Sequence, residues 1–346
     1  MASGYQNIKL LSSPAVARRA FLLGGSGQTG RALIPRLQRR GWEVVVASRG
    51  EREVPAGVEH VTVDRGAEEA LEAAVGDGAD VLVDFAAFEP EHAEQLLALR
   101  DRVGSLVVLS SAAVYFPEDE ADFARLPVPI SERAETVAPG PGGYATKKRA
   151  IELALLEQDA LPATLIRAGA IHGPWSTWAR EWYFVKRVLD GRRAVVLAYR
   201  GASRFHPISV HNLAELIWLA AERPGRRILN AGDPEPPTVL EIGRAIAAKL
   251  EHDWAEVLID EPAGNVGENV WSTPYPVVLD MTEAEFDLGY RPVTSYEHAL
   301  PETVAWLIEA TRGRDWRDVL PTTAKIMEGS FDYAAEDDYI RRLTAD

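Results

Sequence analysis

Hydrophobic residues in the first half of this chain gather in short runs that alternate with amphipathic stretches. The apolar runs, which predict buried strands, lie at residues 21–23, 43–47, 58–63, 81–83, 106–109 and 163–167. The stretches between them repeat apolar residues at helical spacing, near 30–40, 67–74, 90–100 and 144–158. Strands and helices that alternate in this way predict an α/β fold with a doubly wound parallel sheet of the Rossmann type.

The second half differs in composition and predicts a smaller lobe. Aromatic residues cluster between 175 and 184, and later stretches predict further strands and helices as far as 312. We divide the chain into a loose leader (1–19), a dinucleotide-binding domain (20–174), a mixed region that completes the sheet and forms a substrate lobe (175–312), and a C-terminal extension (313–346). The lobe is expected over the carboxyl ends of the strands, where ligands bind in such folds. The charged extension has no predicted place.

Composition narrows the classes of partner. The chain has 37 Lys and Arg against 52 Asp and Glu, a formal net charge of −15, which argues against nucleic acid as the main ligand. It has no cysteine, and its seven histidines are scattered, so we expect no bound metal. No apolar run approaches the roughly 18 residues of a membrane span. We therefore expect a cytoplasmic protein that acts on a small molecule without membrane contact.

Three glycines follow the first predicted strand at intervals of three residues, Gly24, Gly27 and Gly30, and a helical pattern follows them. The order of strand, glycine-rich turn and helix is the context that dinucleotide binding requires. Without side chains the turn can approach a pyrophosphate, and the helix N-terminus offers free N–H groups to it.

The second predicted strand ends at Ser48 and Arg49, with Arg52 close behind. Sites specific for NAD commonly carry an acid here for the ribose 2′-hydroxyl, whereas a guanidinium suits a 2′-phosphate. We therefore expect NADP as the preferred cofactor, with NAD as the alternative.

Tyr144 and Lys148 are four residues apart on a predicted helix and so share one face. A tyrosine hydroxyl, with a pKa near ~10, is a poor acid or base at neutral pH unless a cation favours the phenolate. We expect Lys148 to lower the pKa of Tyr144. Ser110 and Ser111 end an earlier strand, and a hydroxyl there could hold a substrate carbonyl oxygen beside the tyrosine.

These motifs, in this order, resemble the extended short-chain dehydrogenase/reductase superfamily, and within it the NAD(P)-dependent epimerase/dehydratase family. The resemblance spans roughly residues 20 to 312. It includes the glycine turn, Val63-Asp64, Phe85-Ala86-Ala87, Ser110 to Tyr115, the Tyr144 and Lys148 pair, Arg167, His172-Gly173-Pro174 and Arg204 to Ala214.

The resemblance implies roles for individual residues. Ser111, Tyr144 and Lys148 would be catalytic, with Tyr144 as the acid/base and Lys148 holding the nicotinamide ribose. The implied cofactor-binding residues are Gly24, Gly27, Gln28, Thr29, Gly30, Ser48, Arg49, Asp64, Arg65, Ala86, Ala87, Ser110, Tyr144, Lys148 and Ala170. The implied substrate-binding residues are Ala113, His172, Trp175, Trp178 and Arg204, of which Arg204 matches a position that often contacts the diphosphate of a nucleotide sugar. A homodimer through helices near 90–100 and 144–158 is the family expectation.

Several positions depart from the family pattern. Ala112 and Ala113 replace the Asp-Glu pair of sugar-nucleotide 4,6-dehydratases, which argues against that elimination chemistry. His172 replaces the usual tyrosine and either contacts substrate or packs in its place. Trp175, Trp178 and Trp182 form either a substrate wall or part of the core. His206 and His211 are expected to be structural.

Three functions follow from these features. The leading hypothesis is an NADP(H)-dependent oxidoreductase that transfers hydride at a carbonyl/carbinol carbon, with Tyr144 moving the proton. The second is an epimerase of a nucleotide-activated sugar, favoured by Arg204. The third is a non-catalytic relative that binds a nucleotide or RNA, which the intact Ser/Tyr/Lys set and the acidic charge disfavour.

Overall fold

One large parallel sheet dominates the computed structural model, which describes residues 17–67, 69–116 and 123–345. Its seven strands run in the order β10, β6, β5, β4, β1, β2, β3. Their bounds are Arg19–Leu23 (β1), Glu43–Ser48 (β2), Glu59–Thr62 (β3), Val81–Asp84 (β4), Leu106–Ser111 (β5), Ala163–Ala168 (β6) and Arg227–Ala231 (β10). The sheet confirms the predicted Rossmann-type architecture. Of the predicted leader, residues 1–16 lie outside the described residues, and Arg19 already belongs to β1.

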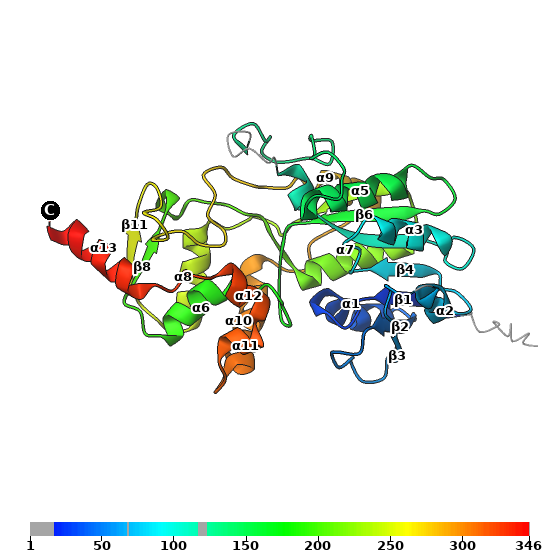
Figure 1. Ribbon diagram of the computed structural model, residues 1–346, viewed down its shortest axis with the longest axis horizontal. Coiled ribbons are helices and arrows are strands. Elements are labelled where there is room, and N and C mark those ends of the chain that lie inside the picture. Colours follow the sequence, from blue (N-terminus) through cyan, green and yellow to red (C-terminus); the bar gives the residue numbers. More distant parts are fainter. Residues whose placement is uncertain (1–16, 68, 117–122, 346) are drawn as a thin grey trace, which may run out of the picture.

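Helices cover both faces of this sheet (Figure 1). On one face, α1 (Gln28–Arg39), α7 (Val210–Glu222) and α9 (Thr282–Leu288) share an apolar core with side chains of the strands. On the other, α2 (Ala70–Val75), α3 (Glu91–Ala98) and α5 (Tyr144–Leu156) do the same. Both faces are therefore buried, which is why the strand sequences are continuously apolar instead of alternating.

A smaller lobe follows in the second half of the chain. Strands β8 (Ala194–Leu197) and β11 (Ala255–Leu258) pair in parallel, and helices α6 (Trp182–Leu189), α8 (Val239–Lys249) and α10 (Tyr296–Thr311) pack beside them. Trp182, Tyr183 and Phe184 are buried in this lobe, and Phe184 stacks on Trp271 with ring centroids 6.0 Å apart. This part of the aromatic cluster is therefore core.

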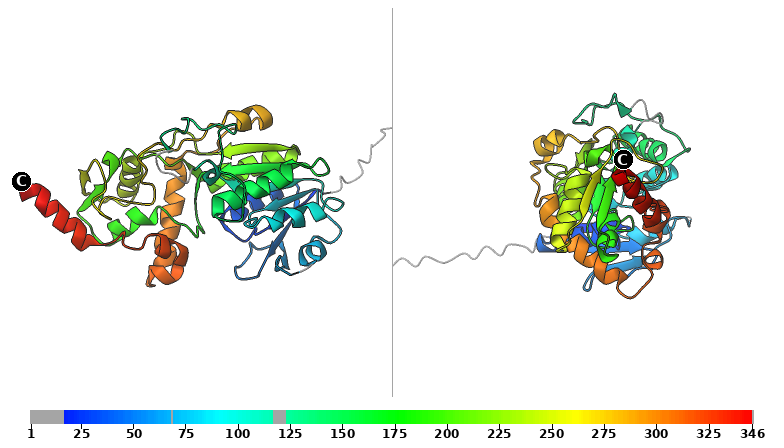
Figure 2. Two further views of the ribbon diagram at one scale, coloured as in Figure 1. Left: turned by 45° about the horizontal axis from the view of Figure 1, so that its top comes forward. Right: turned by 90° about the vertical axis from the view of Figure 1, so that its left-hand side faces the viewer.

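The C-terminal extension, which had no predicted place, is built into the smaller lobe. Its helices are α11 (Trp316–Val319), α12 (Pro321–Ile326) and α13 (Tyr333–Ala345). Met327 joins the aromatic core, and Glu336 of α13 forms a buried ion pair with Arg187 at 2.5 Å. Figure 2 shows α13 at the end of the molecule farthest from the large sheet.

Several short elements have no counterpart in the prediction. They are β7 (Ala170–His172), β9 (Pro207–Ser209), β11, α9 and the 3-10 turns η1 (Ala112–Tyr115) and η2 (Tyr199–Gly201). Apart from α9, each has three or four residues, too few to establish a period in the sequence. None of the helices in the described ranges is long and apolar enough to cross a membrane.

Candidate active site

A cavity of about 1080 Å³ opens at the carboxyl ends of the large sheet's strands, facing the smaller lobe. Side chains and backbone from both halves of the chain line it. Most of the residues named from the sequence meet there: Gly24, Gly27, Gln28, Thr29, Gly30, Ser48, Arg49, Asp64, Arg65, Ala86, Ser110, Ser111, Ala113, Tyr144, Lys148, Trp175 and Trp178. Ala87, Ala170, His172 and Arg204 do not line it.

The glycine turn forms one end of this cavity. Gly24 has a positive φ of 80°, and the N–H of Gly24 donates to Ala47 O at 2.8 Å, which fixes the turn against β2. Gly27 precedes the first turn of α1, which carries no acidic residue and no side-chain cap. Its free N–H groups and the positive end of the helix dipole are thus available to an anion. The buried Oε1 of Gln28 also lacks a hydrogen-bond partner. The N–H groups of the turn and of the first turn of α1 fit a dinucleotide pyrophosphate, whereas the Gln28 oxygen, an acceptor, needs a donor from another group.

Gly30→Ala is expected to destabilise the protein by roughly 1–3 kcal/mol, the range for overpacking. A β-carbon at this position would collide with the backbone of Gly25. Thermal unfolding measures the loss, and Gly27→Ala is the matched control. A β-carbon at Gly27 would lie 3.4 Å from Gly24 O, an ordinary contact, so its loss should be clearly smaller. Equal losses would contradict the packing argument.

Charged residues line the part of the cavity where β2 and β3 end, next to the glycine turn. The Arg49 side chain is 70% exposed, and its Nη2 lies 3.0 Å from Glu51 Oε2. Arg65 is held in place, since its Nη1 donates to Asp84 Oδ2 at 2.9 Å and to Ala86 O at 3.0 Å. Arg49 is therefore the more adjustable of the two cations.

The three residues expected to be catalytic also come together. Ser111 ends β5, Tyr144 begins α5, and the side chain of Ser111 is hydrogen bonded to that of Tyr144. Lys148 lies one turn further along α5 and is 2% exposed. Its Nζ donates to Ala87 O at 2.6 Å and to Leu109 O at 2.8 Å, and burial lowers the pKa of Lys148 to about 8.

The electrostatics of Tyr144 correct the prediction that Lys148 lowers its pKa. Although 52% of Tyr144 is exposed, its desolvation raises the pKa above the ordinary value, and the hydrogen bond from Ser111 opposes this rise. The cation that lowers the pKa of Tyr144 is Arg180. Lys148 Nζ is 5.7 Å from the centre of the Tyr144 ring and is directed to main-chain carbonyls instead.

His172 is buried away from the cavity, at the end of β7. Its Nε2 lies 2.7 Å from Asp233 Oδ2, and its ring packs against Tyr296. The charge and hydrogen bond of Asp233 outweigh the opposing effect of burial and raise the pKa of His172. Of the two alternatives left by the sequence, these contacts favour packing.

Ala170 and Ala87, which were also expected at the cofactor, do not line the cavity. Ala170 begins β7, the strand that ends at His172, and the carbonyl of Ala87 accepts a hydrogen bond from Lys148 Nζ.

His206 and His211 also contact protein groups. His206 Nε2 lies 2.6 Å from Asp233 O, and its Nδ1 accepts a hydrogen bond from Leu279 N at 2.8 Å. His211 Nε2 lies 2.7 Å from Glu302 Oε2 at the surface. In the described parts of the chain, no three His, Asp or Glu side chains come together in a way that could hold a metal ion.

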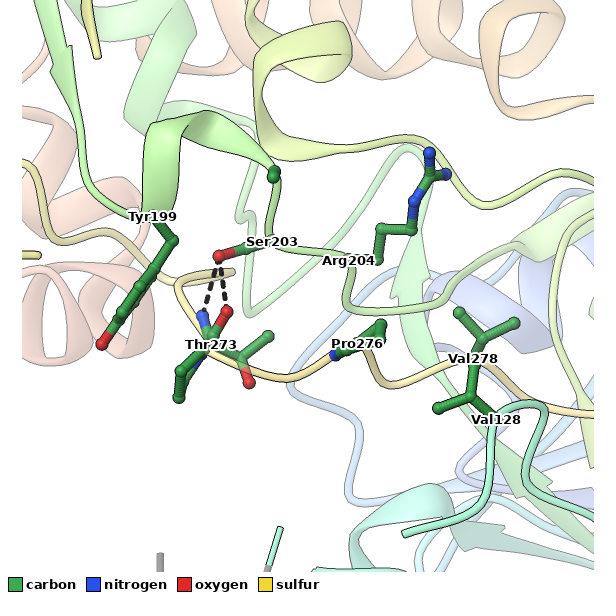
Figure 3. A pocket seen from close by; sticks show the side chains of 9 residues that line it. Val128, Tyr199, Ser203, Arg204, Thr273, Pro276 and Val278 are labelled. Atoms are coloured by element: carbon green, nitrogen blue, oxygen red, sulfur yellow. Dashed lines mark hydrogen bonds between the residues drawn. The ribbon is translucent and has the colours of Figure 1, made fainter. Parts of the chain in front are cut away.

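Arg204 lies beside a separate cavity of about 430 Å³, shown in Figure 3. Its Nη1 donates to Pro236 O, and its side chain points away from Pro276 and Val278. Ser203, the residue before it, donates through its Oγ to Thr273 O at 2.7 Å. The structure therefore does not bring Arg204 to the cavity that holds Tyr144.

The sequence reasoning missed several residues of the main cavity. They include Arg180, Phe88, Phe205, Thr322 and the segment 176–177. Arg180 follows Trp178 by two residues, so a charge inside an aromatic cluster was the available signal. Thr322 lies on α12 in the extension, and no local pattern marks it.

Comparison with known proteins agrees with this geometry. Residues 20–98 match the model of the NAD dependent epimerase/dehydratase family. The chain is similar to a 2′-dehydrokanamycin reductase of Streptomyces kanamyceticus, with 26% identity over 318 residues, 86% of each chain. The family match confirms the resemblance found in the sequence.

Solved structures share the fold. The epimerase Mth375 of Methanothermobacter thermautotrophicus superposes with a TM-score of 0.68 at 17% identity, covering 88% of this chain and 94% of its own. WbmG of Bordetella bronchiseptica, solved with NAD and UDP, gives 0.66 at 20% identity, covering 85% and 96%. Together the comparisons show that the chain shares the fold of these epimerases and is similar to a reductase over most of its length.

Proposed function

We propose that this protein is an NADP(H)-dependent oxidoreductase acting at a carbonyl/carbinol carbon of a small molecule. One observation carries the proposal: the hydrogen-bonded Ser111 and Tyr144 open into the same cavity as the glycine turn, with Lys148 buried one helical turn away. Gly24, Gly27 and the start of α1 would hold the pyrophosphate of the cofactor. A bound nicotinamide would supply or accept the hydride.

In the reductive direction, the Tyr144 hydroxyl donates its proton to the substrate oxygen while Ser111 orients that oxygen by a hydrogen bond. Because desolvation raises the pKa of Tyr144, the phenol keeps its proton at neutral pH and can serve as the acid. The reductive rate should therefore hold through neutral pH and fall in alkaline solution, first as Lys148 loses its proton above pH about 8 and then as Tyr144 deprotonates. We expect the Lys148 ammonium to hold the nicotinamide ribose when the cofactor is bound.

Arg49 supports a preference for NADP. Arg49→Ser is expected to weaken NADPH binding about tenfold, or about 1.4 kcal/mol, and to leave NADH binding unchanged. Fluorescence titration measures both. Glu51→Gln is the control, because removing the carboxylate beside Arg49 should leave NADPH binding equal or tighter. An equal loss for both cofactors in Arg49→Ser would contradict a role at the 2′-phosphate.

A nucleotide-sugar epimerase is the second candidate, favoured by the similarity to WbmG, which was solved with NAD and UDP. Denaturing the purified protein and identifying any released nucleotide separates the two. Retained NAD, with product formed from a catalytic amount of cofactor, would favour the epimerase. Stoichiometric oxidation of added NADPH would favour the reductase.

The homodimer through α3 and α5 remains part of the proposal, and light scattering tests it.

A further inference from the structure

Arg180 is a buried cation that lines the main cavity. It is 8% exposed, and in the described parts of the chain no carboxylate lies within 4.0 Å of its nitrogen atoms. Its Nε is buried and has no hydrogen-bond partner. The guanidinium lies 3.7 Å from the centre of the Trp178 ring and 5.8 Å from that of Phe205. The guanidinium thus packs against the aromatic wall of the cavity.

Two other arginines are at least as deeply buried, and both have carboxylate partners. Arg167 pairs with Glu152 at 2.7 Å, and Arg187 pairs with Glu336 at 2.5 Å. A buried charge is costly unless it is paired and hydrogen bonded. Arg180 faces a binding cavity instead, so a ligand can supply the missing partner.

The charges around Arg180 support an external anion. Glu181 is buried and acts on Arg180 through its charge, but no ion pair joins them, and the Tyr296 hydroxyl donates to Glu181 at 3.2 Å. The carboxylates that line the cavity, Glu51 and Asp64, follow β2 and β3 at the cofactor end. The substrate end therefore has an excess of positive charge.

The segment that carries Arg180 is held from the C-terminal extension. Thr323 of α12 accepts a hydrogen bond from Ala179 N at 3.0 Å through its Oγ1, which also donates to Thr177 O at 3.2 Å. These contacts hold the backbone that carries Arg180, and Trp178 packs against its guanidinium, so less entropy is lost when a ligand binds.

We propose that Arg180 binds an anionic oxygen group of the substrate, a carboxylate or a phosphate, close to the carbon that is reduced. This inference rests on the proposed function and names its substrate class. Phe88, Phe116, Trp175, Trp178 and Phe205 give the cavity aromatic walls, so the remainder of the substrate is expected to be apolar or planar.

Anion binding also has a consequence for Tyr144. In the free protein the charge of Arg180 lowers the pKa of Tyr144. An anion on Arg180 neutralises that charge, so the phenol holds its proton more firmly when substrate is present. The substrate thereby favours the protonation state that reduction requires.

Calorimetric titration of the NADP⁺-saturated protein tests the assignment, because NADP⁺ fills the cofactor end and cannot reduce a ketone. The probes are two matched pairs, benzoylformate with its methyl ester, and phenyl phosphate with phenol. At least one anion should bind about tenfold more tightly than its neutral partner. Preference in the first pair indicates a carboxylate substrate, and preference in the second indicates a phosphate. The absence of preference in both pairs overturns the proposal.

Variants of Arg180 test whether this residue causes the preference for the anion. Arg180→Met should abolish the preference for the anion and leave the neutral probe within about twofold, while Arg180→Lys should keep part of it. Arg244→Met is the control for a lost charge, since Arg244 pairs with Glu256 at the surface. A preference for the anion that survives in Arg180→Met overturns the assignment. If that variant does not fold, the comparison of anionic and neutral probes on the unchanged protein still tests the proposal. If NADP⁺ itself fails to bind, the proposed function fails, whereas NADP⁺ binding without anion preference removes this inference alone.

Discussion

Tyr144→Phe is expected to lower turnover about a hundredfold to ten-thousandfold on any carbonyl substrate that the protein reduces, the range for loss of a general acid. The variant removes the one hydroxyl that Ser111 contacts on α5 and leaves the ring in place. Stopped-flow measurement of NADPH oxidation gives the rate, and fluorescence titration gives the affinity for NADPH. The affinity should be almost unchanged, because the lost atom belongs to the substrate end of the cavity.

The control for this prediction is Tyr275→Phe. Tyr275 is 40% exposed and does not line the main cavity, so turnover should equal that of the unchanged protein. If Tyr144→Phe retains full turnover, Tyr144 is not the acid and the mechanism is wrong. If both the affinity for NADPH and the turnover fall, Tyr144 contributes to the binding of the cofactor as well.

Arg167→Met is expected to lower the free energy of unfolding by about 3–5 kcal/mol, the cost of breaking a buried ion pair. Arg167 donates to Glu152 through both Nε and Nη2, at 2.9 and 2.7 Å. Its Nη1 donates to the Tyr115 hydroxyl at 2.9 Å, and Ser110 Oγ donates to Glu152 at 2.7 Å. Loss of the guanidinium leaves the buried Glu152 carboxylate without this ion-pair partner, so its charge is less well stabilised. Denaturant unfolding measures the effect.

This network also links the elements that carry the catalytic groups. Glu152 lies on α5 with Tyr144 and Lys148, and Ser110 precedes Ser111 on β5. The same variant should therefore lower turnover in addition to stability. Arg312→Met is the control, because the exposed pair of Arg312 with Glu309 should contribute less than about 1 kcal/mol. Similar losses for the two variants would show that burial of the pair does not determine its contribution.

The sequence predicts those parts of the site that depend on local pattern. The spacing of Gly24, Gly27 and Gly30 after an apolar strand is readable because a turn is built from neighbouring residues. The pair of Tyr144 and Lys148 is readable because a helix brings residues four apart to one face. Ser111 could be added because it ends a predicted strand ahead of that helix and because the resemblance implies a catalytic hydroxyl there.

Local patterns do not predict the positions of Arg180, Arg204 and Thr322. Their positions relative to the cavity depend on how the smaller lobe packs, which links residues more than a hundred positions apart in the chain. The resemblance assigned Arg204 to substrate, whereas its guanidinium contacts Pro236 O beside another cavity. The prediction that Lys148 lowers the pKa of Tyr144 was wrong for a related reason. The carbonyls that hold Lys148 away from Tyr144 belong to Ala87 and Leu109, which are distant from Lys148 in the sequence.

Titration of the purified protein with NADPH and with NADH tests the central claim most directly, once any co-purified nucleotide has been identified. We expect both to bind, and NADPH about tenfold more tightly, about 1.4 kcal/mol, because we propose that Arg49, which lines the cavity, pairs with the 2′-phosphate. Retained NAD would favour the epimerase instead. If neither cofactor binds, the glycine turn does not hold a dinucleotide, and the oxidoreductase function is contradicted.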